Sequence, residues 1–161
     1  MVRLAMVGCG QISERFFKQA EARDDVEFVA TCARRIENAE AKGREHGVDR
    51  WYDDYERMYD EVRPDGVVIT TPHALHAAPA IAALDRRIHV LDEKPMATSF
   101  EDCAAMVAAA EESGALLMCL PFDHNPSFRT ALQYLNEQTL GKLTVAEAVL
   151  QIPGPPRDDS Y

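Results

Sequence analysis

Two glycines near the amino terminus, Gly8 and Gly10, lie where a strand pattern meets a helix pattern. The apolar residues 4–7 before them predict a buried parallel strand, and residues 11–22 after them have helical spacing. A strand, a Gly-x-Gly turn and a helix form the diphosphate-binding turn of a dinucleotide-binding fold, because glycine lets the backbone approach the phosphates and the helix N–H groups face them. The alternative is a purely structural turn. The predicted cofactor contacts here are Gly8, Gly10, Gln11 and Ile12.

A lysine follows a second strand pattern, in the sequence Glu93-Lys94-Pro95 after residues 89–92. Lys94 is a candidate for proton transfer, because burial and a neighbouring nicotinamide cation would both favour its neutral amine near neutral pH. The alternative is an ordinary surface lysine in a turn.

The segment Thr71-Pro72 ends a strand predicted at residues 67–71, where open α/β sheets bind ligands. His73 and His76 follow it. We interpret His76 as a structural or ligand-contacting residue rather than a catalytic base, because the sequence places no second group at proton-relay spacing beside either histidine.

Two arginines follow the strand predicted at residues 27–32, at the position where NAD-binding domains usually carry an acid for the adenosine ribose. Ala33 takes that position and Arg34 and Arg35 come next. Without the carboxylate, repulsion of a 2′-phosphate is removed, and guanidinium groups are bidentate partners for phosphate. The pattern favours NADP over NAD, and the alternative is that both arginines are solvated surface residues.

Strands and helices alternate along the chain, which predicts an α/β fold with a Rossmann-type, doubly wound parallel sheet. In addition to the segments above, Thr98 with Glu101 suggests a capping box for a helix that ends near Gly114. The other predicted helices cover residues 36–46, 53–62, 72–84 and 126–138, and further strands cover residues 116–120 and 143–152.

Composition limits the possible partners. The 161 residues carry a formal net charge of −10, which argues against binding to nucleic acid or a membrane surface. No apolar run approaches the roughly 20 residues that span a bilayer, and no secretory signal is recognised. The four cysteines lack metal-ligand spacing, so we expect reduced thiols, a cytoplasmic location and no metal site.

With these residues identified, the chain resembles the glucose–fructose oxidoreductase, inositol dehydrogenase and rhizopine-catabolism (Gfo/Idh/MocA) family. The resemblance rests on Gly8-Cys9-Gly10-Gln11-Ile12-Ser13, Thr71-Pro72 with His76, Glu93-Lys94-Pro95, and residues 122–141. It implies binding of NAD(P) and hydride transfer to or from the secondary alcohol of a sugar or cyclitol. It also implies that Lys94 orients the substrate hydroxyl and assists proton transfer, that Thr71, Pro72 and His76 line the cofactor, and that Glu93 lies against its ribose.

The chain also departs from that family. His124 and Asn125 fall in the segment expected to contact substrate, but family members commonly have a basic residue where Asn125 stands. Members are about twice as long, so we expect a dinucleotide-binding domain at residues 1–121, and a crossover helix with the first strand of a truncated α+β substrate domain at residues 122–161. Such a fragment would bind cofactor without full activity, and the full-length protein would be a homo-oligomer.

Two other functions remain open. A non-catalytic nucleotide-binding accessory or sensor module would share the glycine turn. A methyltransferase has a similar glycine loop, but it usually has acids before the glycines and at the end of the second strand. This chain has Ala5-Met6 and Ala33 at those positions.

Overall fold

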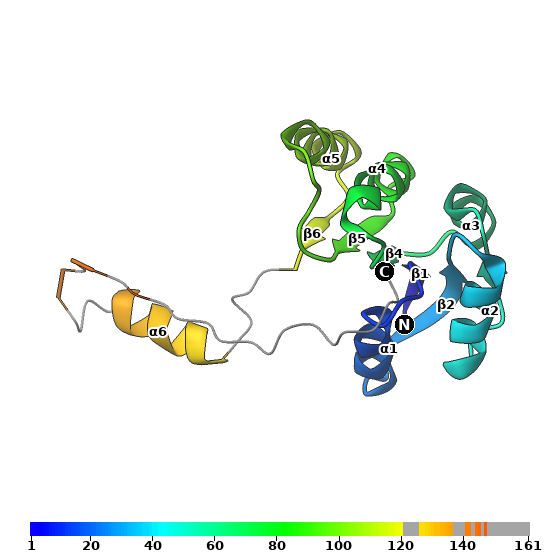
Figure 1. Ribbon diagram of the computed structural model, residues 1–161, viewed down its shortest axis with the longest axis horizontal. Coiled ribbons are helices and arrows are strands. Elements are labelled where there is room, and N and C mark those ends of the chain that lie inside the picture. The colour runs from blue at the N-terminus through cyan, green and yellow to red at the C-terminus, as the bar shows by residue number, and fades with distance from the viewer. Residues whose placement is uncertain (121–125, 137–140, 143, 146, 148–161) are drawn as a thin grey trace, which may run out of the picture. The chain divides into compact units, whose positions relative to one another are not determined.

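The computed structural model describes residues 1–120, 126–136, 141–142, 144–145 and 147. Strands and helices alternate through most of this range (Figure 1). The strands are β1 (Val2–Val7), β2 (Val26–Cys32), β3 (Trp51–Tyr52), β4 (Gly66–Ile69), β5 (His89–Asp92) and β6 (Leu117–Cys119). The helices are α1 (Ser13–Glu21), α2 (Ile36–Glu45), α3 (Tyr55–Val62), the 3-10 turn η1 (His73–Leu75), α4 (Ala77–Asp85), α5 (Phe100–Ser113) and α6 (Pro126–Asn136).

All six strands pair in parallel, in the order β3-β2-β1-β4-β5-β6. Strand order reverses between β1 and β4, and ligands of such folds bind outside the carboxyl ends of the strands at this point. The sequence-based prediction of a Rossmann-type parallel sheet is therefore confirmed.

Two apolar cores cover the two faces of the sheet, because neighbouring strand residues point to opposite faces. Figure 1 shows α3, α4 and α5 on one side, where Met58, Leu84 and Met106 pack with Ala5 and Ile69 in the larger core. On the other face, α1 packs through side chains grouped in a smaller core. That core contains Met6, Phe16, Phe17, Val48 and Val68. The central strand β1 is thus covered on both sides, which fixes the position of the glycine turn that follows it.

The helix caps support one sequence interpretation and correct another. The Asp54 carboxylate accepts hydrogen bonds from the N–H groups of Glu56 and Arg57 and so caps α3, inside the range 53–62 predicted for this helix. The predicted capping box at Thr98 is wrong, because Ser99 precedes α5 and its hydroxyl accepts from the Asp102 N–H at 3.1 Å. The two-residue strand β3 was missed because it is too short to carry a periodic pattern.

Backbone contacts divide the chain into two units, Met1–Pro121 and Phe122–Tyr161. The first contains the whole sheet, and α6 is the helix described in the second. The strand predicted at residues 143–152 falls largely outside the described residues, so its place in a substrate domain stays a prediction. Within the described part of the chain, no helix has the length and apolar character required to cross a membrane.

Candidate functional site

Gly8 brings the end of β1 against the end of β4. Its φ angle is +98°, and a Cβ built on it would lie 2.6 Å from the Thr70 carbonyl carbon and 2.7 Å from the Thr71 nitrogen. Both observations exclude a side chain, because L-residues rarely adopt that angle and Cβ atoms do not approach backbone so closely. The Thr70 hydroxyl donates to the Gly8 carbonyl at 2.6 Å, which holds the two strand ends together.

Gly10 differs from Gly8, because a Cβ built on it would meet nothing within 4 Å. The packing of the protein therefore does not require glycine here, whereas close approach of a ligand would. Helix α1 begins just beyond, and its N-cap residue Ile12 provides no side-chain cap. The Ser13 and Glu14 N–H groups donate to the Gly10 and Gln11 carbonyls at 3.2 and 3.3 Å. The N–H groups of Gln11 and Ile12 have no backbone acceptor in the described part of the chain and can face an anion. The turn fits a diphosphate, with Gly10, Gln11 and Ile12 exposed beside it.

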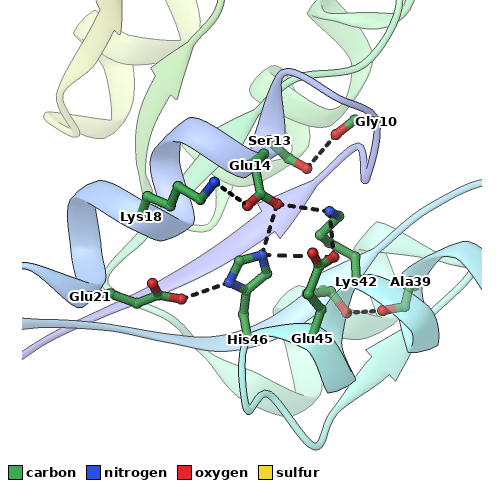
Figure 2. A network of polar contacts seen from close by, with 10 residues as sticks. Gly10, Ser13, Glu14, Lys18, Glu21, Ala39, Lys42, Glu45 and His46 are labelled. Carbon is green, nitrogen blue, oxygen red and sulfur yellow. Dashed lines mark hydrogen bonds and ion pairs between the residues drawn. The ribbon is translucent and has the colours of Figure 1, made fainter.

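Ser13 and a network of ions fix the orientation of α1 (Figure 2). The buried Ser13 hydroxyl donates to the Gly10 carbonyl at 2.7 Å. Farther along α1, the Glu14 carboxylate lies 3.0 Å from Lys42 Nζ and 3.0 Å from His46 Nε2, both contributed by α2 and its carboxyl end. The Lys42 ammonium, with Lys18 and His46, lowers the pKa of Glu14 to about 2. These contacts join α1 to α2 behind the glycine turn.

The same network gathers three side chains that could bind a metal ion. Ligand atoms of Glu14, Glu45 and His46 lie within 4.8 Å of one another. However, Lys42 Nζ contacts the Glu14 carboxylate at 3.0 Å and the Glu45 carboxylate at 2.7 Å. Since the Lys42 ammonium pairs with both carboxylates and the Lys18 ammonium pairs with Glu14 as well, the arrangement is that of an ion-pair network between two helices.

The end of β2 carries the predicted determinants of cofactor choice. The Ala33 N–H donates to the Tyr52 carbonyl at 3.1 Å, which aligns this end with β3. Arg34 and Arg35 follow and are exposed, and Arg35 precedes α2 without capping it by its side chain. The ion pairs found in the described part of the chain include neither arginine, so both guanidinium groups remain available to an anion.

The residues after β4 and β5 lie next to each other because the two strands are paired, with Ile69 opposite Asp92. The Glu93 N–H donates to the Ile69 carbonyl at 3.0 Å and continues this pairing. Glu93 is 6% exposed, and its Oε1 lies 3.6 Å from the Arg15 guanidinium without a hydrogen bond. The structure thus brings Glu93 to the same edge of the sheet as Thr71 and Pro72.

Lys94 lies at this edge and its backbone N–H donates to the Glu93 carboxylate at 3.0 Å. The residue is exposed, so the burial expected from the sequence is wrong. The reason is that the parallel pairing ends at Asp92 and the chain leaves the sheet there. An exposed ammonium at this edge can still reach a ligand bound across the strand ends.

His76 lies beneath these residues and is fully buried. Its Nε2 is 2.8 Å from the Thr71 carbonyl oxygen, and its Nδ1 is 3.1 Å from Oδ1 of the fully buried Asp92. The sequence showed no second group at proton-relay spacing beside this histidine, and the structure brings one, Asp92, from the end of β5. Alternation along β5 was the available signal, because Asp92 shares the buried face of Val90.

The pKa values of His76 and Asp92 are shifted by burial and by the charge of the other residue of the pair. Burial raises the pKa of Asp92 above its ordinary value, although the imidazole opposes that shift. Burial also disfavours a charged His76, but Asp92 and the carbonyl groups of Thr71 and Pro95 outweigh it and raise the pKa of His76. Both shifts favour retention of a proton by the pair.

Most predicted site residues thus lie at the carboxyl ends of parallel strands: those of the glycine turn after β1, Ala33 to Arg35 after β2, Thr71 and Pro72 after β4, and Glu93 and Lys94 after β5. His124 and Asn125 lie outside the described residues. This arrangement can hold an extended anionic cofactor along the strand ends, with an ammonium group beside it.

Comparisons with known proteins agree with this geometry. D-glucoside 3-dehydrogenase of Escherichia coli is 31% identical over 91% of this chain. The scyllo-inositol 2-dehydrogenase (NADP(+)) IolU of Bacillus subtilis is 29% identical over 85% of it. The WlbA dehydrogenase of Bordetella pertussis, solved with NADH and UDP-GlcNAcA, superposes with a TM-score of 0.82 at 30% identity, covering 88% of this chain and 44% of that structure.

The chain spans 42% of the length of each of the two curated relatives. The model of the oxidoreductase family with an NAD-binding Rossmann fold matches residues 2–120, which include the whole parallel sheet and every site residue described above. By this match, and by the glycine turn and strand-end residues that lie within it, the chain belongs to the Gfo/Idh/MocA oxidoreductase family.

Proposed function

We propose that this protein binds NADP in preference to NAD and takes part in reversible oxidation of a secondary alcohol on a sugar or cyclitol. The observation that carries the proposal is the open space at Gly10 beside an uncapped helix start, at the same edge of the sheet as Glu93 and Lys94. The relatives named for sugar and cyclitol dehydrogenases support the substrate class.

The preference for NADP rests on Ala33, Arg34 and Arg35. Ala33 has no carboxylate to repel a 2′-phosphate, and the two guanidinium groups are exposed at the end of β2. The protein has a net charge of −10, which repels anions in general. A 2′-phosphate therefore needs cations next to its own binding position, and the two arginines supply them.

In the proposed reaction, NADP supplies the site that gains or loses the hydride. The residues of the protein bind and orient. Backbone N–H groups of the turn before α1 hold the diphosphate. The Thr71-Pro72 segment lines the cofactor site at the end of β4. The Lys94 ammonium donates a hydrogen bond to the substrate hydroxyl oxygen, which favours the alkoxide character that develops there during oxidation.

Titration of protein fluorescence with NADPH and NADH tests the cofactor assignment. In Arg34→Ala we expect NADPH affinity to fall about tenfold, because a charge-assisted hydrogen bond to a phosphate contributes on the order of 1.5 kcal/mol, and NADH affinity to stay unchanged. Arg44→Ala is the matched control, because it removes the same charge from the exposed side of α2, where Arg44 pairs with Glu40. Equal affinities of the wild type for NADPH and NADH would remove the NADP assignment.

The role of Lys94 is tested separately in the full-length protein. Lys94→Ala should lower turnover of a polyol while NADPH affinity is retained. Undiminished turnover would show that Lys94 takes no part in the reaction.

A further inference from the structure

The carboxyl and imidazole groups buried in the described part of the chain are not scattered. By whole-residue exposure, its buried acids and histidines are His76, Asp92 and Glu93. Asp92 and Glu93 lie at the carboxyl end of β5, and His76, between η1 and α4, contacts Asp92. The other buried polar residues are the hydroxyl-bearing Ser13, Thr31 and Thr70, and each donates to a backbone carbonyl. Buried ionisable groups cluster at functional sites, so this concentration points to the edge that holds Lys94.

Hydrogen-bond geometry fixes the position of one proton of the pair. The Thr71 carbonyl oxygen can only accept, so His76 Nε2 carries a hydrogen. On the other side, Nδ1 lies 3.1 Å from Asp92 Oδ1 at an angle short of a directed hydrogen bond, and Asp92 Oδ2 also lacks a donor. A proton shared between Nδ1 and Oδ1, as imidazolium with carboxylate or as neutral imidazole with carboxylic acid, would remove the repulsion between these two acceptor atoms.

The contact between His76 and Asp92 joins the Thr71-Pro72 segment to the turn at Lys94, and both lie beyond the last paired residues of β4 and β5. His76 holds the carbonyl of Thr71 and precedes α4. Asp92 is the last residue of β5, its carbonyl accepts from the Leu120 N–H at 2.9 Å, and Glu93-Lys94 follows it directly. The contact between His76 and Asp92 therefore sets the position of the Thr71-Pro72 segment relative to the turn at Lys94.

We propose that His76 and Asp92 are positioning residues that keep the Lys94 turn and the Thr71-Pro72 segment in a fixed register for hydride transfer. This inference rests on the proposed function. An apolar pair would fill the same space, and replacement of a buried ion pair by well-packed apolar residues is often neutral or stabilising. The polar attraction between His76 Nδ1 and Asp92 Oδ1, 3.1 Å apart, is the property that an apolar pair lacks. Other titratable groups near the pair are Glu93 on the same strand end, Cys119 on β6 and His73, whose ring centre is 5.9 Å from that of His76.

Three variants separate positioning from packing. Asp92→Asn keeps a donor opposite His76 Nδ1 and should behave like the wild type. Asp92→Leu keeps the number and branching of the side-chain heavy atoms and removes the polar contact. The double variant His76→Leu with Asp92→Leu replaces the pair by apolar groups and should unfold at or above the wild-type temperature.

The first measurement is backbone hydrogen exchange of the ligand-free protein at residues 71–76 and 93–97. We expect exchange about tenfold faster in both leucine variants and within about threefold of the wild type in Asp92→Asn. Unchanged exchange in the double variant would overturn the proposal, as would faster exchange spread equally over the whole sheet, because a structural role alone predicts the latter.

The second measurement follows turnover in the full-length protein, with scyllo-inositol as the probe substrate and NADP as the cofactor. The leucine variants should lose at least tenfold in kcat while NADPH affinity stays within about threefold, and Asp92→Asn should retain kcat. Wild-type kcat in the double variant would overturn the positioning role. If the wild type fails to bind NADPH while the exchange result holds, the proposed function fails and the structural coupling of the two segments stands.

Discussion

Two glycines separated by one residue should respond to the same substitution in opposite ways. Gly8→Ala adds a Cβ at a φ of +98° and 2.6 Å from the Thr70 backbone, whereas Gly10→Ala adds one with nothing within 4 Å. The left-handed conformation alone costs about 1–2 kcal/mol in a non-glycine residue, and the overlap with Thr70 forces β1 and β4 apart. We expect Gly8→Ala to lower the free energy of unfolding by about 3 kcal/mol.

For Gly10→Ala, the free energy of unfolding should stay the same or rise by up to about 1 kcal/mol, because alanine restricts the unfolded chain and meets no obstacle in the folded one. Affinity for NADPH should fall at least tenfold. The new methyl group takes space next to the helix start, and loss of one N–H bond to a charged phosphate costs about 1.5–3 kcal/mol.

Urea denaturation and NADPH fluorescence titration measure the two quantities independently. Gly114→Ala is the matched control, because Gly114 has a φ of +72° and a Cβ there meets nothing within 4 Å. It should lose about 1–2 kcal/mol from strain alone and leave NADPH affinity unchanged. Wild-type NADPH affinity in Gly10→Ala would refute the placement of the diphosphate over this turn. Equal stability losses in Gly8→Ala and Gly114→Ala would refute the argument from close strand approach.

Two further predictions concern stability. Ser99→Ala should lower the free energy of unfolding by about 1 kcal/mol through loss of the α5 cap, while Thr98→Ala should be nearly silent, and urea denaturation of both variants decides which residue caps the helix. The pKa of Glu14 is lowered from 4.5 to about 2, so its ion pairs stabilise the folded state fully above pH 4.5 and that stability is lost as the pH falls toward 2. Glu14→Gln should remove this part of the acid dependence, and an unaltered acid unfolding profile between pH 4.5 and 2 would contradict the network shown in Figure 2.

The sequence predicted correctly those features that depend on residues close together along the chain. Glycine positions, apolar runs and helical spacing predicted β1, the turn after it and the alternation that becomes a parallel sheet. The Asp54 cap and the glycine that ends α5 follow from rules that act within a few residues. These signals were sufficient for the fold class and for most of the residues at the strand ends.

The misplaced helix cap marks the limit of such rules. Thr98 and Ser99 are adjacent hydroxyl residues, and the capping rule accepts either one. The choice depends on where the backbone leaves the Lys94 turn and enters α5, which is a property of the folded chain.

What the sequence alone determined is therefore the order of elements and the edge of the sheet at which they place their polar residues. Only the tertiary structure decided that His76 meets Asp92, that Lys94 is exposed, and that Glu14 joins Lys42 and His46. The physical reason is that periodicity and capping depend on neighbours along the chain. The contacts of His76 with Asp92 and of Glu14 with Lys42 and His46 instead join residues 16 or more positions apart, which come together when the strands pair and the helices pack.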